Sequence, residues 1–279
     1  MPYIVPIDQA RALFPDVEFV AALTPSAQKA AFHVRKDDRD LCLKLISPDY
    51  GTDRVHREIL AMRKIDHPNV VKILEYEFSA KEDAEKHYLV EEFVAGADLS
   101  DHIVPGHPWS VDKIISVFEP LLHGLEELRR VDVVHRDLKP TNIRIRTDGA
   151  PVIIDFGLAR HLDMTSLTPT PFGAALGTPR YFAPEQFLGT KRDIDHRTDL
   201  YAVGVMMYEV AIGRHPSITQ QIKTMEQLSK AVCESKGWAA QTEFDELPDQ
   251  LRMLIRRMLA KSRSQRPPSA ALAARMLSK

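Results

Sequence analysis

Four residues in the middle of the chain have the types and the spacing that a phosphoryl-transfer site needs. Asp137 is followed by Lys139 and Asn142 within one short stretch, and Asp155 follows the apolar run 151–154. Such an aspartate orients an attacking hydroxyl and accepts its proton, the lysine neutralises the migrating phosphoryl group, and asparagine and aspartate oxygens hold a metal ion. The ordinary alternative is a polar turn before a hairpin. Four apt residues in this order favour the catalytic interpretation.

The stretch 135–142 reads His-Arg-Asp-Leu-Lys-Pro-Thr-Asn, and residues 155–157 read Asp-Phe-Gly. Together they resemble the catalytic and metal-binding loops of the eukaryotic-like serine/threonine protein kinases, and the resemblance covers roughly residues 20–270. It implies an autophosphorylating enzyme that moves the γ-phosphoryl group of ATP to protein Ser or Thr hydroxyls with Mg²⁺. It also implies the catalytic roles Asp137 as base and Lys139 as charge neutraliser, and the metal ligands Asn142 and Asp155.

The fold implied by the resemblance is α+β and two-lobed. A small antiparallel β lobe with one helix, residues 1–93, would bind the nucleotide. A larger, mainly α lobe, residues 94–279, would carry catalysis and substrate binding, the two forming one domain.

Lys44 closes the stretch Leu41-Cys42-Leu43-Lys44, which matches the strand that presents the phosphate-binding lysine in the family. An unpaired lysine on a half-buried strand is costly, so it needs a partner. Glu58, in the first turns of the next expected helix, is the natural one. The alternative is a strand-edge lysine and a solvated glutamate.

A third block, residues 177–185, matches the segment that receives a peptide substrate. Thr178 and Lys139 together resemble serine/threonine rather than tyrosine kinases. Glu185 is expected to pair with Arg266. Asp199 resembles the buried anchor that hydrogen-bonds the catalytic-loop backbone, and the alternative is a helix N-cap.

The glycine-rich turn of the family is missing, because residues 24–31 contain no glycine. Glycine serves there because the backbone must approach phosphate closely. Ser26, Gln28 and Lys29 could supply side-chain donors instead. The sequence therefore predicts weakened or differently organised nucleotide binding.

Aligning residues 92–96 with the family's hinge places Glu91 where an apolar residue is usual, and Arg144 beneath the base. A buried Glu91 needs a partner, for which Lys44 or a donor on the nucleotide would serve. Arg144 could stack on the purine. A one-residue slip would instead turn Val90 to the pocket. The expected nucleotide contacts are Ser26, Lys29, Ala31, Cys42, Lys44, Glu58, Glu92, Val94 and Arg144.

Hydrophobic periodicity outlines the elements that must position these residues. Residues 1–35 are only weakly patterned. Strands are expected at 32–34, 40–46, 70–78 and 87–94, with a helix at 54–65. The second half predicts a helix from Ser110 through 130, a hairpin around 147–149, a buried helix at 200–210 and another helical face at 251–259.

The composition gives no reason to expect other classes. A formal charge of -2 offers no argument for a nucleic-acid or anionic-membrane partner. Two cysteines without a metal or bridge pattern favour a reducing cytosol, hence a cytoplasmic protein. No apolar run of about 18 residues is present to span a bilayer.

Two alternatives stay open. The glycine-free turn favours a kinase-like binding or scaffold module, which the intact Lys44, Asp137, Asn142 and Asp155 oppose. A small-molecule kinase shares the aspartate-asparagine loop, but the block at 183–185 belongs to peptide docking.

Hydroxyls at Thr165, Ser166, Thr168 and Thr170 are expected phosphorylation sites read by Arg136, or incidental loop residues. The substrate protein and the oligomeric state are not encoded in any motif.

Overall fold

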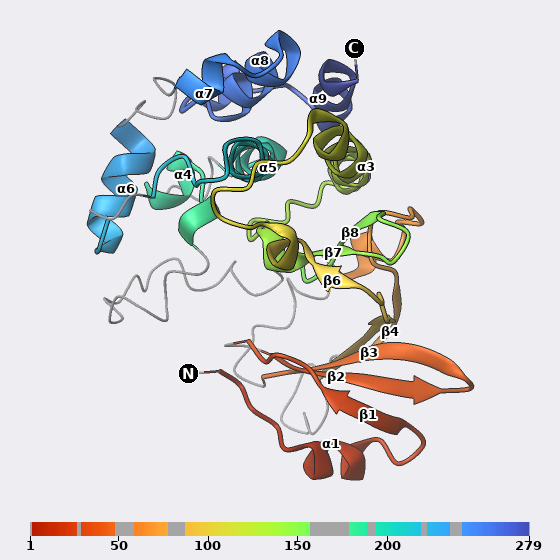
Figure 1. Cartoon of the computed structure of the whole chain (residues 1–279). Coiled ribbons are helices and arrows are strands. Elements are labelled where there is room, and N and C mark those ends of the chain that lie inside the picture. The colour runs from red at the N-terminus through yellow and green to blue at the C-terminus, as the bar shows by residue number, and fades with distance from the viewer. Residues whose placement is uncertain are drawn as a thin grey trace. The chain divides into compact units, whose positions relative to one another are not determined.

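The computed structural model describes residues 2–26, 29–47, 59–77, 87–156, 179–188, 194–218, 222–234 and 242–278. The chain divides into two compact units. The first comprises Met1–His67 and Val71–Ala95, and the second comprises Pro68–Val70 and Gly96–Lys279. Figure 1 shows an antiparallel sheet in the first unit and mainly helices in the second, so the predicted fold class is confirmed.

The first unit is built on a five-stranded antiparallel sheet with the strand order β1-β2-β3-β5-β4. Its strands are β1 (Glu18–Ala22), β2 (Lys29–Lys36), β3 (Arg39–Ile46), β4 (Ile73–Glu77) and β5 (Tyr88–Glu92). Asp37 and Asp38 make the tight β2–β3 turn with positive φ angles of 51° and 58°. Aspartate tolerates this conformation better than most residues, which explains how these two residues can connect the strands.

The two faces of this sheet carry different chemistry because successive strand residues point to opposite sides. On one face Phe32, Leu43 and Leu45 join a buried apolar cluster. The helix α1 (Ile7–Leu13) and the residues after it pack on this cluster. The sequence predicted one helix in this unit, at 54–65, and did not predict α1. Residues 59–62 of the expected helix are helical, and residues 54–58 lie outside the described part.

The second unit is organised around two long helices, α3 (Val111–Arg130) and α5 (His196–Ile212). Ser110 caps α3 as predicted, accepting a hydrogen bond from the backbone N–H of Lys113 at 3.3 Å. The helix α5 is buried nearly all round, also as predicted. Helix α8 (Asp249–Met258) approaches α5 closely at Gly204, where an added Cβ would lie 2.6 Å from that of Met258.

Shorter elements make up the rest of what the structure describes in the second unit. They include the α-helices α4 (Pro184–Phe187), α6 (Met225–Glu234), α7 (Thr242–Asp245) and α9 (Ala270–Leu277). A three-stranded sheet contains β6 (Ala97–Asp98), β7 (Ile143–Ile145) and β8 (Pro151–Ile153). The β7–β8 hairpin turns through Gly149 with φ at 88°, where the sequence predicted it.

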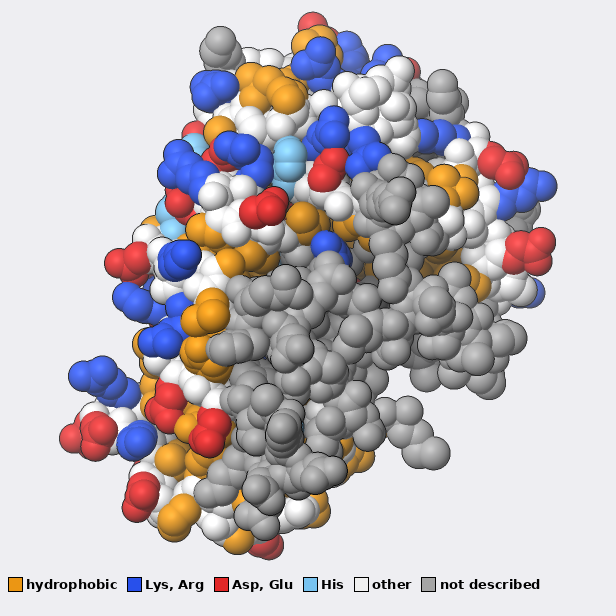
Figure 2. Space-filling model, turned by 180° about the vertical axis from the view of Figure 1, so that it is seen from behind, with side chains coloured by type: hydrophobic (Ala, Val, Ile, Leu, Met, Phe, Trp, Pro, Cys, Tyr) orange, Lys and Arg blue, Asp and Glu red, His pale blue; other side chains and the backbone are white. Residues whose placement is uncertain are grey.

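The described surface bears both signs of charge, and basic and acidic side chains both lie on the face shown in Figure 2. In the part of the chain that the structure describes, no helix is long and apolar enough to cross a membrane.

Candidate functional site

The backbone of the loop that carries Asp137 is held by a buried side chain from α5. Asp199 is 4% exposed and accepts two hydrogen bonds, from the backbone N–H of His135 at 2.8 Å and of Arg136 at 2.9 Å. Burial raises the pKa of Asp199 to about 6, although these two N–H groups oppose the shift. The predicted anchor is confirmed. The N-cap alternative is wrong, because Asp195 occupies the cap of α5.

The loop brings three of the predicted residues together. The Lys139 ammonium lies 3.1 Å from the Asp137 carboxylate. The Asn142 side-chain amide donates to the Asp137 carbonyl at 2.8 Å and lies 3.5 Å from its carboxylate. These contacts hold the carboxylate between a cation and an amide, an arrangement that can orient a hydroxyl group and stabilise developing negative charge.

Asp155 is tied to the same loop through the backbone that precedes it. The N–H of Ile154 donates to the Asn142 carbonyl at 2.9 Å, and the Ile154 carbonyl accepts from His135 Nε2 at 3.1 Å. Asp155 itself has a positive φ of 60°, an uncommon conformation for a residue other than glycine. Such conformations cluster at functional sites.

His135 and Phe156 lie beside each other next to the catalytic stretch. Their rings lie 5.2 Å apart, and the side chain of Phe156 is buried. With Nε2 of His135 donating, its Nδ1 accepts from the backbone N–H of Asp137 at 3.3 Å. The histidine therefore fixes the backbone on both sides of the catalytic stretch.

The residues present suit a magnesium ion. Mg²⁺ takes oxygen ligands and is commonly held by one or two protein groups together with substrate phosphates. Because the Asn142 amide nitrogen donates to Asp137, its carbonyl oxygen is the atom left to face a cation. Asp155 adds a carboxylate directly after Ile154, whose backbone is bonded to Asn142.

A second set of contacts ties the 179–188 segment to the core of this unit. Glu185 and Arg266 form a buried two-pronged ion pair, with N–O distances of 2.6 and 2.8 Å, which confirms the predicted pairing. Thr198 adds a hydrogen bond to Glu185 at 2.8 Å. Two charges can be buried at modest net cost because each satisfies the other.

Gln186 makes a connection that the sequence did not predict. Its side-chain amide donates to the Arg136 carbonyl at 2.9 Å, while its oxygen accepts from the Ala183 N–H at 3.0 Å. The side chain thus joins the 179–188 segment to the catalytic loop directly. The only signal in the sequence was a polar residue next to Glu185, and a glutamine at such a position is not distinctive.

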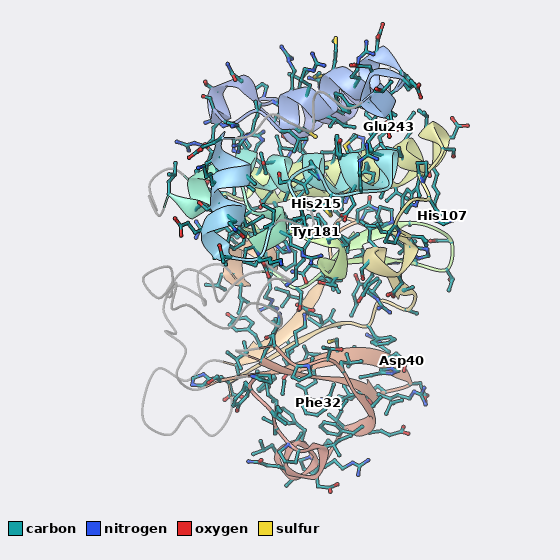
Figure 3. All side chains as sticks on the ribbon, turned by 60° about the vertical axis from the view of Figure 1, so that its left-hand side comes forward. Phe32, Asp40, His107, Tyr181, His215 and Glu243 are labelled. Atoms are coloured by element: carbon teal, nitrogen blue, oxygen red, sulfur yellow. The ribbon has the colours of Figure 1, made fainter. Side chains whose placement is uncertain are left out.

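Tyr181, in the same segment, forms a further polar cluster with His215, and the two are seen next to each other in Figure 3. The Tyr181 hydroxyl donates to Glu209 at 2.7 Å, and burial raises the pKa of both groups. His215 Nε2 donates to the Arg180 carbonyl at 3.0 Å, while its Nδ1 accepts backbone N–H groups from Ser217 and Ile218. Burial lowers the pKa of His215 to about 3.

In the first unit, Lys44 pairs with Glu91. The Lys44 ammonium donates to the Glu91 carboxylate, and the two residues are 5% and 2% exposed. Glu91 lies opposite Cys42, two positions from the partner of Lys44, so both side chains occupy one face of the sheet. The buried position predicted for Glu91 is confirmed, and the one-residue slip is wrong. The expected partner of Lys44, Glu58, lies outside the described residues.

Two more predicted residues share this face. Ala31 is paired with Lys44 across β2 and β3, and Cys42 is paired with Glu91; both are buried. Ala31 belongs to β2 and not to the turn, because β2 already begins at Lys29. The predicted turn at 24–31 is therefore too long. Ser26 and Lys29 face each other across it through a 2.9 Å backbone hydrogen bond.

The segment after β5 is held by backbone contacts. The N–H of Glu92 donates to the Lys72 carbonyl at 3.0 Å, and the Glu92 carboxylate accepts from the Lys72 N–H at 3.1 Å. Val94 is buried in the same unit. These contacts fix the backbone of the expected hinge but do not test its contacts to a nucleotide.

Arg144 on β7 contacts the start of the second unit. Its guanidinium pairs with Asp98 at 2.8 Å and donates to the Gly96 carbonyl. Gly96 has φ at 137°, and a side chain there would run into the Ile145 carbonyl at 2.0 Å. The guanidinium is thus oriented by β6, and stacking on a purine stays a prediction.

Other predicted positions lie outside the described residues. They are Gln28, Glu58, Thr165, Ser166, Thr168, Thr170 and Thr178.

Residues 28–277 match the family model described as the protein kinase domain. The chain is similar to curated bacterial proteins. It is 33% identical over 183 residues to a probable serine/threonine-protein kinase of Corynebacterium efficiens, and 33% identical over 187 residues to the serine/threonine-protein kinase PrkC of Bacillus subtilis. It is 38% identical over 167 residues to the serine/threonine-protein kinase Pkn1 of Myxococcus xanthus. These alignments cover 64%, 64% and 58% of this chain but only 27%, 27% and 23% of the relatives.

Proposed function

Because the chain belongs to the protein kinase family, we propose that it transfers the γ-phosphoryl group of Mg-ATP to serine or threonine hydroxyls of proteins. The observation that carries the proposal is the loop in which Lys139 and Asn142 flank the Asp137 carboxylate. The relatives named as serine/threonine kinases support the class of acceptor. Because the chain aligns with about a quarter of their length, its own substrates need direct identification.

In this proposal Asp137 accepts a hydrogen bond from the acceptor hydroxyl and points the hydroxyl oxygen at the γ-phosphorus. It takes the hydroxyl proton as the new O–P bond forms and the bond from the γ-phosphorus to the bridging oxygen of the β-phosphate breaks, which leaves ADP. Lys139, already 3.1 Å from Asp137, neutralises the charge of the transferring group. Asn142 and Asp155 would hold the metal ion. When bound, Mg²⁺ would offset the phosphate charge. The work of the protein is then mainly positioning and electrostatic stabilisation.

The nucleotide end of the proposal rests on the first unit. Lys44 would contact the phosphates, and Ala31 and Cys42 share its face of the sheet. Ser26 and Lys29 at the glycine-free turn would supply donors, while the backbones of Glu92 and Val94 would meet the base. Glu91 distinguishes this site, because its carboxylate already forms an ion pair with the Lys44 ammonium.

The direct test measures phosphate transfer from labelled Mg-ATP to the protein itself and to a mixture of Ser, Thr and Tyr peptides. Asp137→Asn is expected to lower transfer by roughly a hundredfold or more. Asp112→Asn, at an exposed site in the first turn of α3, serves as the matched control. If the Asp137 variant transfers phosphate as fast as the parent, Asp137 is not the base. Phosphosite mapping of the same samples tests autophosphorylation at 165–170.

A second function has two observations in its favour. The Lys44–Glu91 pair and the absence of glycine at 24–31 suit a kinase-like binding module that engages partners without turnover. The two functions separate in one comparison: a catalyst loses ATP turnover on Asp155→Ala, whereas a binding module has no turnover to lose.

A further inference from the structure

A cavity of about 350 Å³ opens on the face of the first unit's sheet that packs against the N-terminal residues. Its volume lies within the range of small-molecule sites, about 300–1,000 Å³. The lining comes from two regions, the chain around the end of α1 and the strands β2 to β5. The residues that matter most for the argument are Phe14, Val34, Leu43, Glu75, Glu77 and Tyr88.

This cavity is separate from the Lys44–Glu91 face. Leu41 and Leu43 alternate with Cys42 and Lys44 along β3, so the two pairs point to opposite sides of the sheet. Val90 alternates with Glu91 in the same way on β5. A ligand in the cavity would therefore lie across the sheet from the predicted nucleotide contacts.

The floor of the cavity is apolar and its wall is aromatic. Val34 and Leu43 are buried at the floor, and Leu41 and Val90 are partly exposed. The rings of Phe14 and Tyr88 meet at 84° with their centroids 5.0 Å apart. Two rings at a right angle form a corner, and the face of an aromatic ring attracts cations through its quadrupole.

The charged groups around the cavity favour the same kind of ligand. Asp16, Glu75 and Glu77 contribute carboxylates, and Lys36 contributes an ammonium group, which leaves an excess of negative charge among the lining residues that the structure describes. The Tyr88 hydroxyl donates to Glu75 at 2.6 Å and so holds that carboxylate beside the aromatic corner. Burial raises the pKa of Tyr88, with Glu75 adding to the shift, so the phenol remains a donor.

We propose that this cavity binds a small organic cation, an ammonium group attached to an apolar body. The body would lie on the Val34–Leu43 floor, and the ammonium group would lie between the Tyr88 ring and the Glu75 and Glu77 carboxylates. An anion would be repelled by the excess of carboxylates around the cavity. A neutral molecule of the same shape would gain the apolar contact but not the charge attraction.

Phenethylammonium is a suitable probe, and 2-phenylethanol is its uncharged counterpart of nearly the same shape. Both are titrated into the whole protein with labelled Leu and Val methyl groups, followed by NMR. The expected result is that the methyl signals of Val34, Leu41 and Val90 shift with the ammonium compound and move at least tenfold less at equal concentrations of the alcohol. Equal shifts with both compounds, or shifts confined to other methyl groups, would overturn the proposal.

Variants of the carboxylates provide a second test of the proposal. The double substitution Glu75→Gln and Glu77→Gln keeps the shape of the rim and an acceptor for Tyr88 but removes two charges. It is expected to weaken phenethylammonium binding about tenfold while leaving the response to the alcohol unchanged. Glu18→Gln, an exposed carboxylate on β1 that does not line the cavity, is the matched control. If both variants bind the ammonium compound as the parent does, the carboxylates do not select the ligand and the proposal fails.

Discussion

The carboxylate of Glu91 on β5 and the ammonium of Lys44 on β3 form an ion pair inside the small sheet unit. A buried pair of this kind gains little net stability, yet removing one member typically costs about 3–5 kcal/mol, because the other charge is left buried. In the proposed kinase, the same ammonium must also meet nucleotide phosphates. Glu91 therefore competes for the group on which nucleotide binding depends.

The first prediction concerns Glu91→Met. The substitution removes one partner of Lys44, so we expect ATP to bind several-fold more tightly and the nucleotide-free protein to unfold at a lower temperature. Calorimetry and thermal unfolding measure the two effects, with Glu18→Gln as the control. If neither ATP nor GTP binding changes, Glu91 does not compete at the nucleotide site.

The second prediction concerns Gln186→Glu. The carboxylate keeps the acceptor for the Ala183 N–H but loses the donor to the Arg136 carbonyl, which lies next to Asp137. We expect kcat to fall about tenfold, because the lost contact positions the loop, and the urea midpoint to fall as well, because the new carboxylate is buried. Gln227→Glu on α6, which keeps its acceptor oxygen for the N–H groups of Lys223 and Thr224, is the control. A variant with unchanged kcat would show that the Gln186 contact has no part in positioning.

The third prediction concerns the Glu185–Arg266 pair. Arg266→Met leaves Glu185 buried without its cation, and we expect the free energy of unfolding to fall by about 3–5 kcal/mol. Arg266→Lys should cost less, since it keeps the charge and loses only the planar, two-pronged geometry. Urea denaturation provides both values. Two variants of equal stability would mean that the charge retained by the lysine does not stabilise the buried Glu185.

The fourth prediction concerns pH. Between about 6.5 and 3 an unfolded His215 binds a proton while the folded one does not, because its pKa is lowered. The unfolded state then binds more protons, so this residue's contribution to stability is lost as pH falls through that window. His215→Gln removes the titration. The stability difference between parent and variant should therefore shrink by about 1–2 kcal/mol from pH 7 to pH 5 in urea unfolding.

A stability difference that stays constant between those pH values would contradict the low pKa of His215. Glu243 and Arg214 lie nearby as an exposed pair, and Glu243→Gln tests whether the pH effect comes from that pair instead.

Much of the catalytic loop was predictable because its chemistry fixes residue types at short spacing. Asp137, Lys139 and Asn142 are so near one another in the sequence that they are also neighbours in the structure. The pairs Glu185–Arg266 and Asp199–His135 are distant in sequence. They were predictable only through the family resemblance, since spacing alone carries no information about them.

The features that were missed depend on tertiary context. Helix α1 has seven residues, too few for a clear period, and is stabilised by packing on the sheet. The sequence did name Lys44 as one possible partner of Glu91, but only the β3–β5 register, which decides the face on which Glu91 lies, selects it. Gln186 belongs to a four-residue helix whose glutamine is ordinary until the fold brings it to Arg136.

The anchoring of the catalytic loop has a consequence for how the protein acquires activity. The backbone around Arg136 is held by Asp199, 63 residues further on, and by Gln186, 50 residues further on. Closing such long loops is slow and is compensated only when the distant segments dock. We therefore expect the helices of a refolding chain to form before this loop takes its final geometry. In the proposed kinase, phosphate transfer should then return later during refolding than the helical signal.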